Sequence, residues 1–371
     1  MKKILFVDNT AHHLYGQLHN ISAMQKAKYE VSLLIPDDGV YFCKLQNMGF
    51  KCYNDITTWK GQNPFQELAL LLKLKKLIRR IKPDLICSFT IKPNLYTAII
   101  AKSLPIKQVA NITGLGYGFM SGNIKEKAFT FLYRYAFRLV EYIFFQNKDD
   151  YNYFNNSKIA SDSNRLKILP GSGVDLTNYT YVGVTDRANI NFLYSGRLIA
   201  DKGINELVSA FLNVRKKYPT ITLTFIGNYF PDNPSAITEK QIDLWVEQGL
   251  INYLGMVDNV QELIANADCV VLPSYREGMP RSLLEASAMG KPIITVDSVG
   301  CRDVVEDGIT GFMAKVKDVD SLAQAMIKFI ELPLDKKIEM GLNGRRKMER
   351  EFDQKIVVNE YLTVVNKLLN N

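Results

Sequence analysis

Short apolar runs alternate with longer amphipathic stretches along the chain, and this alternation restricts the fold more than any other feature. Ile4–Val7, Leu85–Phe89 and Cys269–Leu272 are such runs, and each precedes a stretch with helical spacing. This order is typical of βαβ units around a parallel sheet. The other predicted strands are Val31–Ile35, Gln108–Ile112, Ile143–Phe145, Asn191–Tyr194, Ile221–Ile226, Ile251–Leu254 and Pro292–Val296. Helices are predicted at Asn63–Ile81, Lys125–Glu141, Ile204–Lys217, Ser235–Gln248, Val260–Ala265, Arg281–Met289, Ser321–Ile330 and Gln354–Leu369.

The alternation runs through the chain twice, which predicts two α/β domains. A length of 371 residues is more than one hydrophobic core usually organises. The break falls in Leu169–Ala188, which is rich in Gly, Thr and Asp. We therefore expect Rossmann-like, doubly wound parallel-sheet domains at 1–180 and 181–353, with a terminal helix at about 354–371 that packs back on the first domain and belongs to it. Ligands of such sheets bind at the carboxyl ends of the strands, here in a cleft that the two domains face.

The cysteines and the apolar segments predict a cytoplasmic protein. The five cysteines are scattered and form no CxxC pair, which argues against a disulfide framework or a zinc site. The apolar start of the chain is too short for a signal peptide and indicates a first strand. No segment reaches the roughly 18 uninterrupted apolar residues of a membrane-spanning helix.

Positive charge is concentrated in the first half of the chain. Residues 1–185 hold 24 Lys and Arg against 13 Asp and Glu, whereas residues 186–371 hold 22 against 25. This asymmetry suggests a polyanionic partner or a membrane surface, and the alternative is a solvated lysine-rich face. Leu70–Lys82 and Ala128–Phe145 combine apolar and basic residues, so they fit either an anionic lipid surface or core helices with a solvated edge. No nucleic-acid-binding module is recognisable.

The segment Ser274–Lys291 follows a buried strand and opens a helix. Gly278 and Pro280 lie at the turn, so backbone N–H groups from Met279 to Leu284 are expected to form an anion site. Glu277 and Glu285 flank the helix start, where carboxylates can accept hydrogen bonds from sugar hydroxyls. The alternative is that Glu285 lies on the helix surface and Glu277 is a loop charge.

A second polar segment, Leu193–Gly203, also follows a predicted strand. Gly196 permits a close approach to a ligand, and Arg197 and Lys202 precede a helix. Two cations at this position can neutralise a diphosphate leaving group without a metal ion. The alternative is a pair of solvated cations in a βα loop.

These segments together resemble those of the GT4 glycosyltransferases, which are retaining, nucleotide-sugar-dependent enzymes with the GT-B fold. The resemblance rests on the E-x7-E pair Glu277 and Glu285, and on the R-x4-K pair Arg197 and Lys202. Further support comes from the segments Gly173–Tyr179, Tyr253–Gly255 and Gly300–Phe312. It extends over nearly the whole chain and is strongest from Leu193 to Phe312.

The resemblance implies roles for the matching residues. Glu285 would hold the ribose hydroxyls, Glu277 the donor sugar, and Arg197 and Lys202 the diphosphate. Transfer would retain the anomeric configuration, and the leaving phosphate would help to remove the acceptor proton. The remaining donor-binding residues would act mainly through backbone: Gly196, Gly278, Met279, Pro280, Leu283, Leu284, and Gly255, Met256 and Val257 near the base.

The first half resembles a narrower group of bacterial transferases that build polysaccharides or lipid-linked oligosaccharides. Phe89–Asn94 and Asn111–Phe119 carry this resemblance. It implies a UDP-sugar donor, with backbone at Gly114 and Gly116 near the donor phosphate and the acceptor. Lys92 follows a strand end, where it could meet the acceptor diphosphate. The alternative for Lys92 is a surface lysine before a proline.

The first βα loop supplies the remaining acceptor-binding candidates. Many relatives have a glycine-rich turn here, whereas this loop offers only Gly16. His12 or His13 could take part in acceptor binding, but two adjacent side chains cannot both face the cleft. The alternative is that both are ordinary loop residues.

No metal or other cofactor is expected. Asp318 and Asp320 match the DxD pattern of metal-dependent transferases, but they directly precede a predicted helix, so we interpret them as capping residues. The sequence thus predicts a retaining transferase that moves GalNAc, GlcNAc or a hexose from a UDP-sugar to a polyprenyl-diphosphate-linked saccharide, at the cytoplasmic face of the inner membrane. The alternatives are a soluble transferase acting on a free sugar or metabolite, and a non-catalytic basic binding protein.

Overall fold

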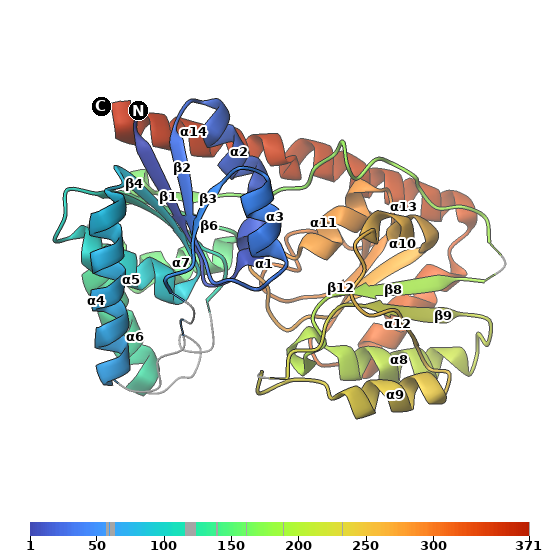
Figure 1. The fold of residues 1–371 in the computed structure, drawn as a ribbon. Coiled ribbons are helices and arrows are strands. Elements are labelled where there is room, and N and C mark those ends of the chain that lie inside the picture. The colour runs from blue at the N-terminus through green and yellow to red at the C-terminus, as the bar shows by residue number, and fades with distance from the viewer. Residues whose placement is uncertain are drawn as a thin grey trace. The chain divides into compact units, whose positions relative to one another are not determined.

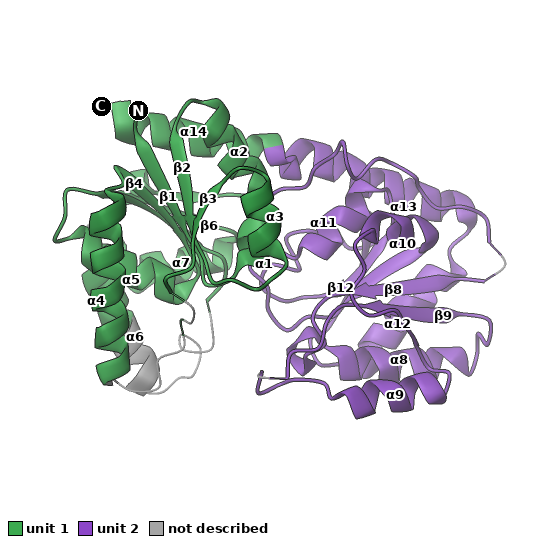
Figure 2. Cartoon of the chain, in the orientation of Figure 1, with its two compact units in different colours: residues 1–172, 355–371 green, residues 173–354 purple. Residues whose placement is uncertain are grey.

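The computed structural model describes residues 1–56, 59, 64–115, 124–138, 140–160, 162–187, 189–231 and 233–370, and only the backbone of 64 and 124–129. The described chain forms two compact units (Figure 2). Unit 1 comprises Met1–Ser172 and Lys355–Asn371, and unit 2 comprises Gly173–Gln354. The chain therefore crosses between the units twice.

Unit 1 is built on a parallel sheet (Figure 1). Among the described residues it has seven strands in the order β3-β2-β1-β4-β5-β6-β7. Their bounds are β1 Lys3–Val7, β2 Glu30–Leu34, β3 Lys51–Tyr53, β4 Leu85–Phe89, β5 Lys107–Ile112, β6 Tyr142–Phe145 and β7 Leu166–Ile168.

Alternate residues of these strands enter separate cores on the two faces of the sheet, as the two-residue period of a strand requires. Leu5 and Val7 pack in one core, and Ile4 and Phe6 pack in the other. The core of Leu5 and Val7 includes α4 Pro64–Ile81, α5 Ile91–Ala101, α6 Ile124–Phe137 and α7 Lys148–Asn156. The core of Ile4 and Phe6 includes α1 Ala11–Tyr15, α2 Leu18–Lys26, α3 Tyr41–Asn47 and α14 Gln354–Asn370.

The terminal helix α14 packs on unit 1, as predicted. Its apolar side chains Val357, Val364 and Val365 are buried in the core with Ile4 and Phe6. The hydroxyl of Tyr361 also donates to the amide oxygen of Asn111, next to the end of β5. The last residues of the chain therefore complete the first domain.

Unit 2 has a second parallel sheet, with six strands in the described residues in the order β10-β9-β8-β11-β12-β13. These are β8 Asn191–Ser195, β9 Thr222–Ile226, β10 Asn252–Tyr253, β11 Cys269–Leu272, β12 Ile293–Val296 and β13 Gly311–Ala314. The helices are α8 Ile204–Arg215, α9 Glu239–Glu247, α10 Val260–Asn266, α11 Arg281–Ala288, α12 Val319–Glu331 and α13 Leu334–Lys347, with a short helical turn η3 at Ala200–Lys202. The prediction of two doubly wound parallel sheets is confirmed.

Each sheet has one point at which the strand order reverses. In unit 1 it lies between β1 and β4, and in unit 2 between β8 and β11. The loops that leave these neighbouring strands run in opposite directions, which opens a crevice at the carboxyl ends of the strands. Both reversal points carry the polar residues described below.

Candidate active site

Lys202 and Glu277 meet at the reversal point of the second sheet. Lys202 ends the turn η3 after β8, and Glu277 follows β11. The Lys202 ammonium donates to the Glu277 carboxylate, and the two side chains are only 11% and 15% exposed. The structure thus joins a cation and a carboxylate that the sequence placed in separate motifs.

Backbone contacts fix the loop that carries Glu277. The amide of Tyr275 donates to the carbonyl of Asp201, and the amide of Glu277 donates to the carbonyl of Val299, each over 2.9 Å. Gly300 packs against this loop with φ +80°, and a Cβ there would lie 2.5 Å from the Glu277 carbonyl oxygen. Only glycine fits both the dihedral angle and the space.

Arg197 lies in the loop that follows β8, at the same reversal point. Its side chain is exposed, and its guanidinium lies 5.5 Å from the ring centre of Phe230. Its carbonyl accepts a 2.7 Å hydrogen bond from the buried Tyr194 hydroxyl. Burial raises the pKa of Tyr194, the Glu277 charge raises it further, and the Arg197 charge lowers it. The charges of Arg197 and Glu277 therefore both influence the pKa of Tyr194.

Gly196 and Gly255, both predicted to bind the donor, are linked through Gly227. Gly227 has φ +143°, and a Cβ there would lie 1.8 Å from the Gly196 carbonyl oxygen. Its amide donates to the Gly255 carbonyl over 2.9 Å. In the same loop Met256 is 57% exposed and Val257 is half-buried. Backbone contacts at Gly227 thus join the loops after β8, β9 and β10.

The start of α11 follows the Glu277 loop. Gly278 and Met279 are half-buried, and Pro280 is the N-cap residue. Leu283 and Leu284 have fully buried side chains, and their amides donate to the Pro280 carbonyl over 3.1 and 3.3 Å. These two amides are therefore used within the first turn, and their effect on an anion would come through the helix dipole.

Glu285 is held by two neighbours inside unit 2. Its carboxylate accepts a 3.0 Å hydrogen bond from the Arg281 guanidinium, and the Tyr179 hydroxyl lies near enough to lower its pKa. The side chain is only 12% exposed, and this burial raises the pKa of Glu285, whereas Arg281 and Tyr179 lower it. Sequence reasoning gave no role to either neighbour, although Tyr179 ends one of the motifs that carry the resemblance.

The first βα loop places the two adjacent histidines in different surroundings. His13 donates from Nδ1 to the fully buried carboxylate of Asp8, at the end of β1. His12 instead packs against Tyr41 of α3, with ring centres 4.7 Å apart. Gly16 ends α1 at φ −63°, an ordinary helical angle. The sequence indicated no role for Asp8.

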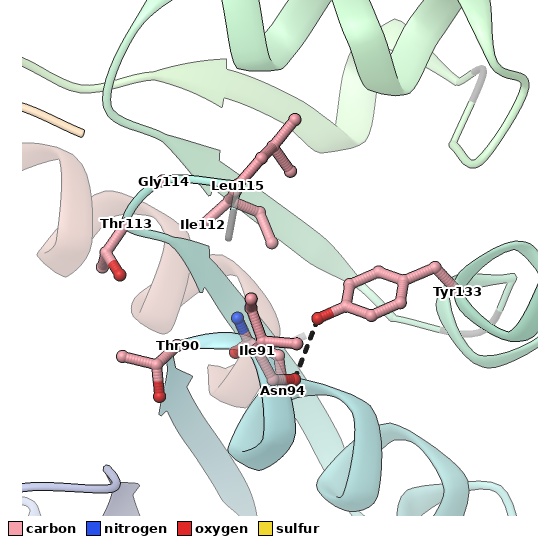
Figure 3. A pocket seen from close by; sticks show the side chains of 8 residues that line it. All are labelled: Thr90, Ile91, Asn94, Ile112, Thr113, Gly114, Leu115 and Tyr133. Atoms are coloured by element: carbon pink, nitrogen blue, oxygen red, sulfur yellow. Dashed lines mark hydrogen bonds between the residues drawn. The ribbon is translucent and has the colours of Figure 1, made fainter. Parts of the chain in front are cut away.

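The loops after β4 and β5 line a small pocket in unit 1 (Figure 3). Lys92 is close by in α5, but its ammonium forms a 2.6 Å ion pair with Glu67 of α4. Tyr133 donates from its hydroxyl to the Ile91 carbonyl over 2.9 Å. The lining is made of Thr90, Ile91, Asn94, Ile112, Thr113, Gly114, Leu115 and Tyr133. Gly116, predicted near the donor phosphate, lies outside the described residues.

The DxD pattern at Asp318 caps a helix, as predicted. The Asp318 carboxylate accepts a 2.8 Å hydrogen bond from the amide of Ser321, and Asp320 lies in the first turn of α12. In the part of the chain that the structure describes, no three His, Cys, Asp or Glu side chains gather as metal ligands would. Glu277 and Lys202 are instead paired with each other.

Two family models together match most of the chain. Residues 185–347 match the family described as "Glycosyl transferases group 1", and residues 3–147 match "Glycosyl transferase 4-like". The chain is a GT4-like glycosyltransferase. The matched regions contain both reversal points, with Lys202, Glu277 and Glu285 in the first family's region.

Relatives of this glycosyltransferase include two enzymes with named lipid-linked substrates. It is 26% identical to N,N'-diacetylbacillosaminyl-diphospho-undecaprenol alpha-1,3-N-acetylgalactosaminyltransferase of Campylobacter jejuni, over 95% of this chain and 94% of that one. It is 21% identical to UDP-Gal:alpha-D-GlcNAc-diphosphoundecaprenol alpha-1,3-galactosyltransferase of Escherichia coli, over 91% and 88% of the two chains.

Solved structures share the fold at full length. HepE from Anabaena, crystallised with UDP and glucose, matches with a TM-score of 0.80 and 18% identity over 100% of both chains. A glycosyltransferase from Rickettsia africae matches with a TM-score of 0.77 and 16% identity over 100% of this chain and 99% of that one. The predicted GT-B architecture is therefore confirmed.

Proposed function

We propose that this glycosyltransferase moves an N-acetylhexosamine or hexose from a UDP-sugar to a saccharide linked to polyprenyl diphosphate. The pairing of Lys202 with Glu277 at the reversal point of the second sheet carries the proposal. The named substrates of the C. jejuni and E. coli relatives, both linked to undecaprenyl diphosphate, support the acceptor class. The UDP-Gal donor of the E. coli enzyme supports the nucleotide.

Each charged group has a defined task in this reaction. An acceptor hydroxyl oxygen bonds to the anomeric carbon while the bond from that carbon to the diphosphate oxygen breaks. UDP leaves with the electron pair, and its leaving phosphate oxygen takes up the proton of the acceptor hydroxyl. Lys202 and Arg197 stabilise the negative charge that develops on the diphosphate. Glu277 accepts hydrogen bonds from the transferred sugar, and Glu285 accepts them from the ribose. Retention of configuration and independence of divalent metal are part of the proposal.

Calorimetric titration with UDP, GDP and ADP tests the donor, and a transfer assay tests the acceptor. We expect micromolar UDP binding that EDTA does not change and that Glu285→Ala weakens. We further expect transfer from a UDP-sugar to a short-chain polyprenyl-diphosphate N-acetylhexosamine. Preference for GDP or ADP would contradict the donor, and transfer only to free sugars would contradict the acceptor. Loss of activity in EDTA that Mg²⁺ restores would contradict the metal-independent mechanism.

We propose, second, that α4 and α6 bind an anionic membrane surface through a face that we name the α4/α6 face. Both helices contact α5. Phe65 and Leu72 on α4 are 84% and 58% exposed, and Phe131 on α6 is 70% exposed. Exposed apolar side chains interleaved with cations are typical of helices that lie in a lipid interface. The exposed cations of this face are Lys73, Lys76, Arg79, Arg80, Arg134 and Arg138.

This surface would bring the enzyme to a membrane-embedded acceptor without a spanning segment. Among the described residues, no helix has the length and apolar character needed to cross a bilayer. The three exposed apolar side chains and the cations of this face instead supply separate hydrophobic and electrostatic contributions to binding. The electrostatic contribution requires anionic lipid and weakens with salt.

Sedimentation with vesicles tests the α4/α6 face. We expect the enzyme to bind vesicles rich in phosphatidylglycerol and to dissociate from them at high salt. It should not bind vesicles of pure phosphatidylcholine. Replacing Phe65 and Phe131 together with Ser should abolish binding but preserve UDP affinity. Leu244→Ser is the matched control, because Leu244 is an exposed apolar residue of unit 2 at 44%. Equal binding by the double variant and the control would contradict this role.

A further inference from the structure

Phe230 lies in the loop that follows β9, next to the side chain of Arg197. The strands β8 and β9 are parallel neighbours in the sheet of unit 2, so the loops that leave them start side by side. The guanidinium carbon of Arg197 lies 5.5 Å from the centre of the Phe230 ring, within the range of a cation–π contact. Because the two residues belong to separate loops, no local motif indicates this contact.

The two loops are hydrogen-bonded to each other through their backbones. The amide of Leu198 donates to the carbonyl of Asn228, and the amide of Ile237 donates to the carbonyl of Leu198, each over 3.0 Å. These contacts lie on either side of Phe230 in the sequence of its loop. The loop that carries the ring is therefore fixed beside the loop that carries Arg197.

The backbone of Arg197 is fixed, whereas its side chain is long and exposed. Among the described residues, no carboxylate forms an ion pair with its guanidinium, in contrast to Lys202, which pairs with Glu277. A neutral ring restrains a guanidinium without cancelling its charge. The contact with Phe230 therefore leaves the full charge of Arg197 available to an anion.

The exposure of Phe230 shows that the ring is not a core residue. It is 38% exposed, and it is not one of the side chains that form the core of unit 2, whereas its neighbour Tyr229 packs against that core. An apolar side chain that stays this exposed contributes less to folding than a buried one. The fold should therefore tolerate a smaller apolar residue at position 230.

We infer that Phe230 is a positioning residue for Arg197 in sugar transfer. A free arginine side chain loses rotamer entropy when it binds an anion. The ring restricts the guanidinium before the donor arrives, which lowers that loss. Phe230 acts through Arg197 and needs no contact of its own with the donor. This inference rests on the proposed function, in which Arg197 stabilises the charge of the diphosphate.

A double-mutant cycle of Phe230→Leu and Arg197→Ala tests the inference. Phe230→Leu should lower kcat/KM for the UDP-sugar about fivefold, as expected for one cation–π contact. In the Arg197→Ala background the same change should cause no further loss, because the ring then has no cation to hold. Phe230→Tyr, which keeps an aromatic face, should recover most of the loss.

Tyr218→Leu is the matched control for removal of a ring beneath a cation. The ammonium of Lys217 lies 5.0 Å from the centre of the Tyr218 ring, and both residues follow the last turn of α8, whereas Lys202 precedes its first turn. Tyr218→Leu should transfer sugar as the wild type does. A loss equal to that of Phe230→Leu would overturn the inference, because the effect would not be specific to Arg197.

Calorimetric titration with UDP and with uridine separates positioning of Arg197 from a direct contact of the ring with the nucleoside. Phe230→Leu should weaken UDP binding and leave the binding of uridine, which has no phosphates, unchanged. Equal weakening of both probes would overturn the inference, because the ring would then support the nucleoside or the loop as a whole.

The outcomes also separate this inference from the proposed function. Phe230→Leu with wild-type kinetics, beside an impaired Arg197→Ala, would overturn the inference alone. Equal losses from Phe230→Leu with and without Arg197 would overturn it as well. Absence of transfer from every UDP-sugar by the wild type would contradict the proposed function, and the comparison of UDP with uridine would still decide the role of Phe230.

Discussion

Lys202 and Glu277 are 75 residues apart in the chain, yet their side chains form an ion pair at the ends of neighbouring strands. Each charge is largely shielded from water, so each depends on the other for compensation. Removing one partner leaves the other charge without its counterion. The same two side chains therefore stabilise the loops after β8 and β11 and take part in the proposed sugar transfer.

Lys202→Ala should reduce turnover far more than it reduces UDP binding. Lys202 is proposed to stabilise charge that develops on the leaving diphosphate, and loss of such a donor costs about two to four orders of magnitude in kcat. Steady-state transfer assays with a UDP-sugar check this. Lys217→Ala is the control, because Lys217 pairs with Glu331 on the exposed surface. Near-wild-type turnover of Lys202→Ala would contradict the assigned role.

Gly300→Ala should impair transfer, whereas Gly308→Ala should not. Both glycines have positive φ, at +80° and +76°, so alanine introduces comparable backbone strain of about 1 kcal/mol at each. Only at position 300 would the Cβ also collide with the Glu277 and Gly278 carbonyls, at 2.5 and 2.7 Å. The loop that carries Glu277 must then move. Comparison of kcat/KM for the two variants distinguishes displacement of the Glu277 loop from backbone strain alone. Circular dichroism verifies that both variants fold.

The inner strands could be predicted from the sequence because side chains on both of their faces are buried. Leu85–Phe89 is apolar apart from Ser88, Cys269–Leu272 is a continuous apolar run, and the structure has strands with those bounds. The prediction missed β3, β7 and β13, which are edge strands of three or four residues. Edge strands bury fewer side chains, so their apolar pattern is weak.

The missed helices have equally local causes. Pro93 lies in the first turn of α5, where proline is tolerated, but the sequence analysis recognised only a strand end before Lys92 and no helix after it. Leu334–Lys347, the helix α13, is rich in charge and lacks a clear apolar stripe. Its buried side is small, so periodicity gave no signal.

The candidate site was predictable where neighbouring residues form a motif and hidden where distant residues meet. Arg197 with Lys202, and Glu277 with Glu285, are local spacings that a reader of the sequence can find. The support of Glu285 by Tyr179 depends on a contact between distant parts of the chain. Asp8 is close to His13 in sequence, but only the turn after β1 reveals their hydrogen bond.

Glu285→Gln should weaken nucleotide binding while it stabilises the fold. Burial raises the pKa of Glu285, so the folded protein binds this proton more tightly than the unfolded chain does. The ionised carboxylate therefore costs stability above its folded pKa, and this cost disappears as the pH falls. Glutamine should raise the melting temperature at pH 8 more than at pH 5. UDP affinity should fall about 10- to 100-fold, because hydrogen bonds to a charged acceptor are lost.

Calorimetric titration with UDP and thermal unfolding at the two pH values check this trade-off. Asp243→Asn, which removes an acidic group from α9 of the same unit, controls for the change in net charge. A stability gain of Glu285→Gln that is equal at pH 5 and pH 8 would show that ionisation of Glu285 is not its cause.

Lys291 should make the stability of unit 2 rise with pH in the alkaline range. Its side chain is buried, and its ammonium donates to the carbonyls of Gly183 and Ala265 over 2.5 and 2.9 Å. Burial lowers the pKa of Lys291 to about 8, against the opposing effect of Asp268. Between that value and the ordinary pKa of 10.5, the unfolded chain holds the proton and the folded chain does not. The free energy of unfolding should then increase by about 1.4 kcal/mol per pH unit.

Denaturant titrations of the wild type and Lys291→Met at pH 7, 8, 9 and 10 measure this slope. Trp245 fluorescence in a Trp59→Phe background reports on unit 2, because the chain has two tryptophans and Trp245 belongs to that unit. The stability difference between wild type and variant should be flat up to about pH 8 and then grow in favour of the wild type. Lys216→Met, an exposed lysine of unit 2, should show no such growth. A parallel pH dependence of Lys291→Met and wild type would mean that Lys291 keeps its proton in the fold, with the two carbonyls stabilising the ammonium more than burial penalises it.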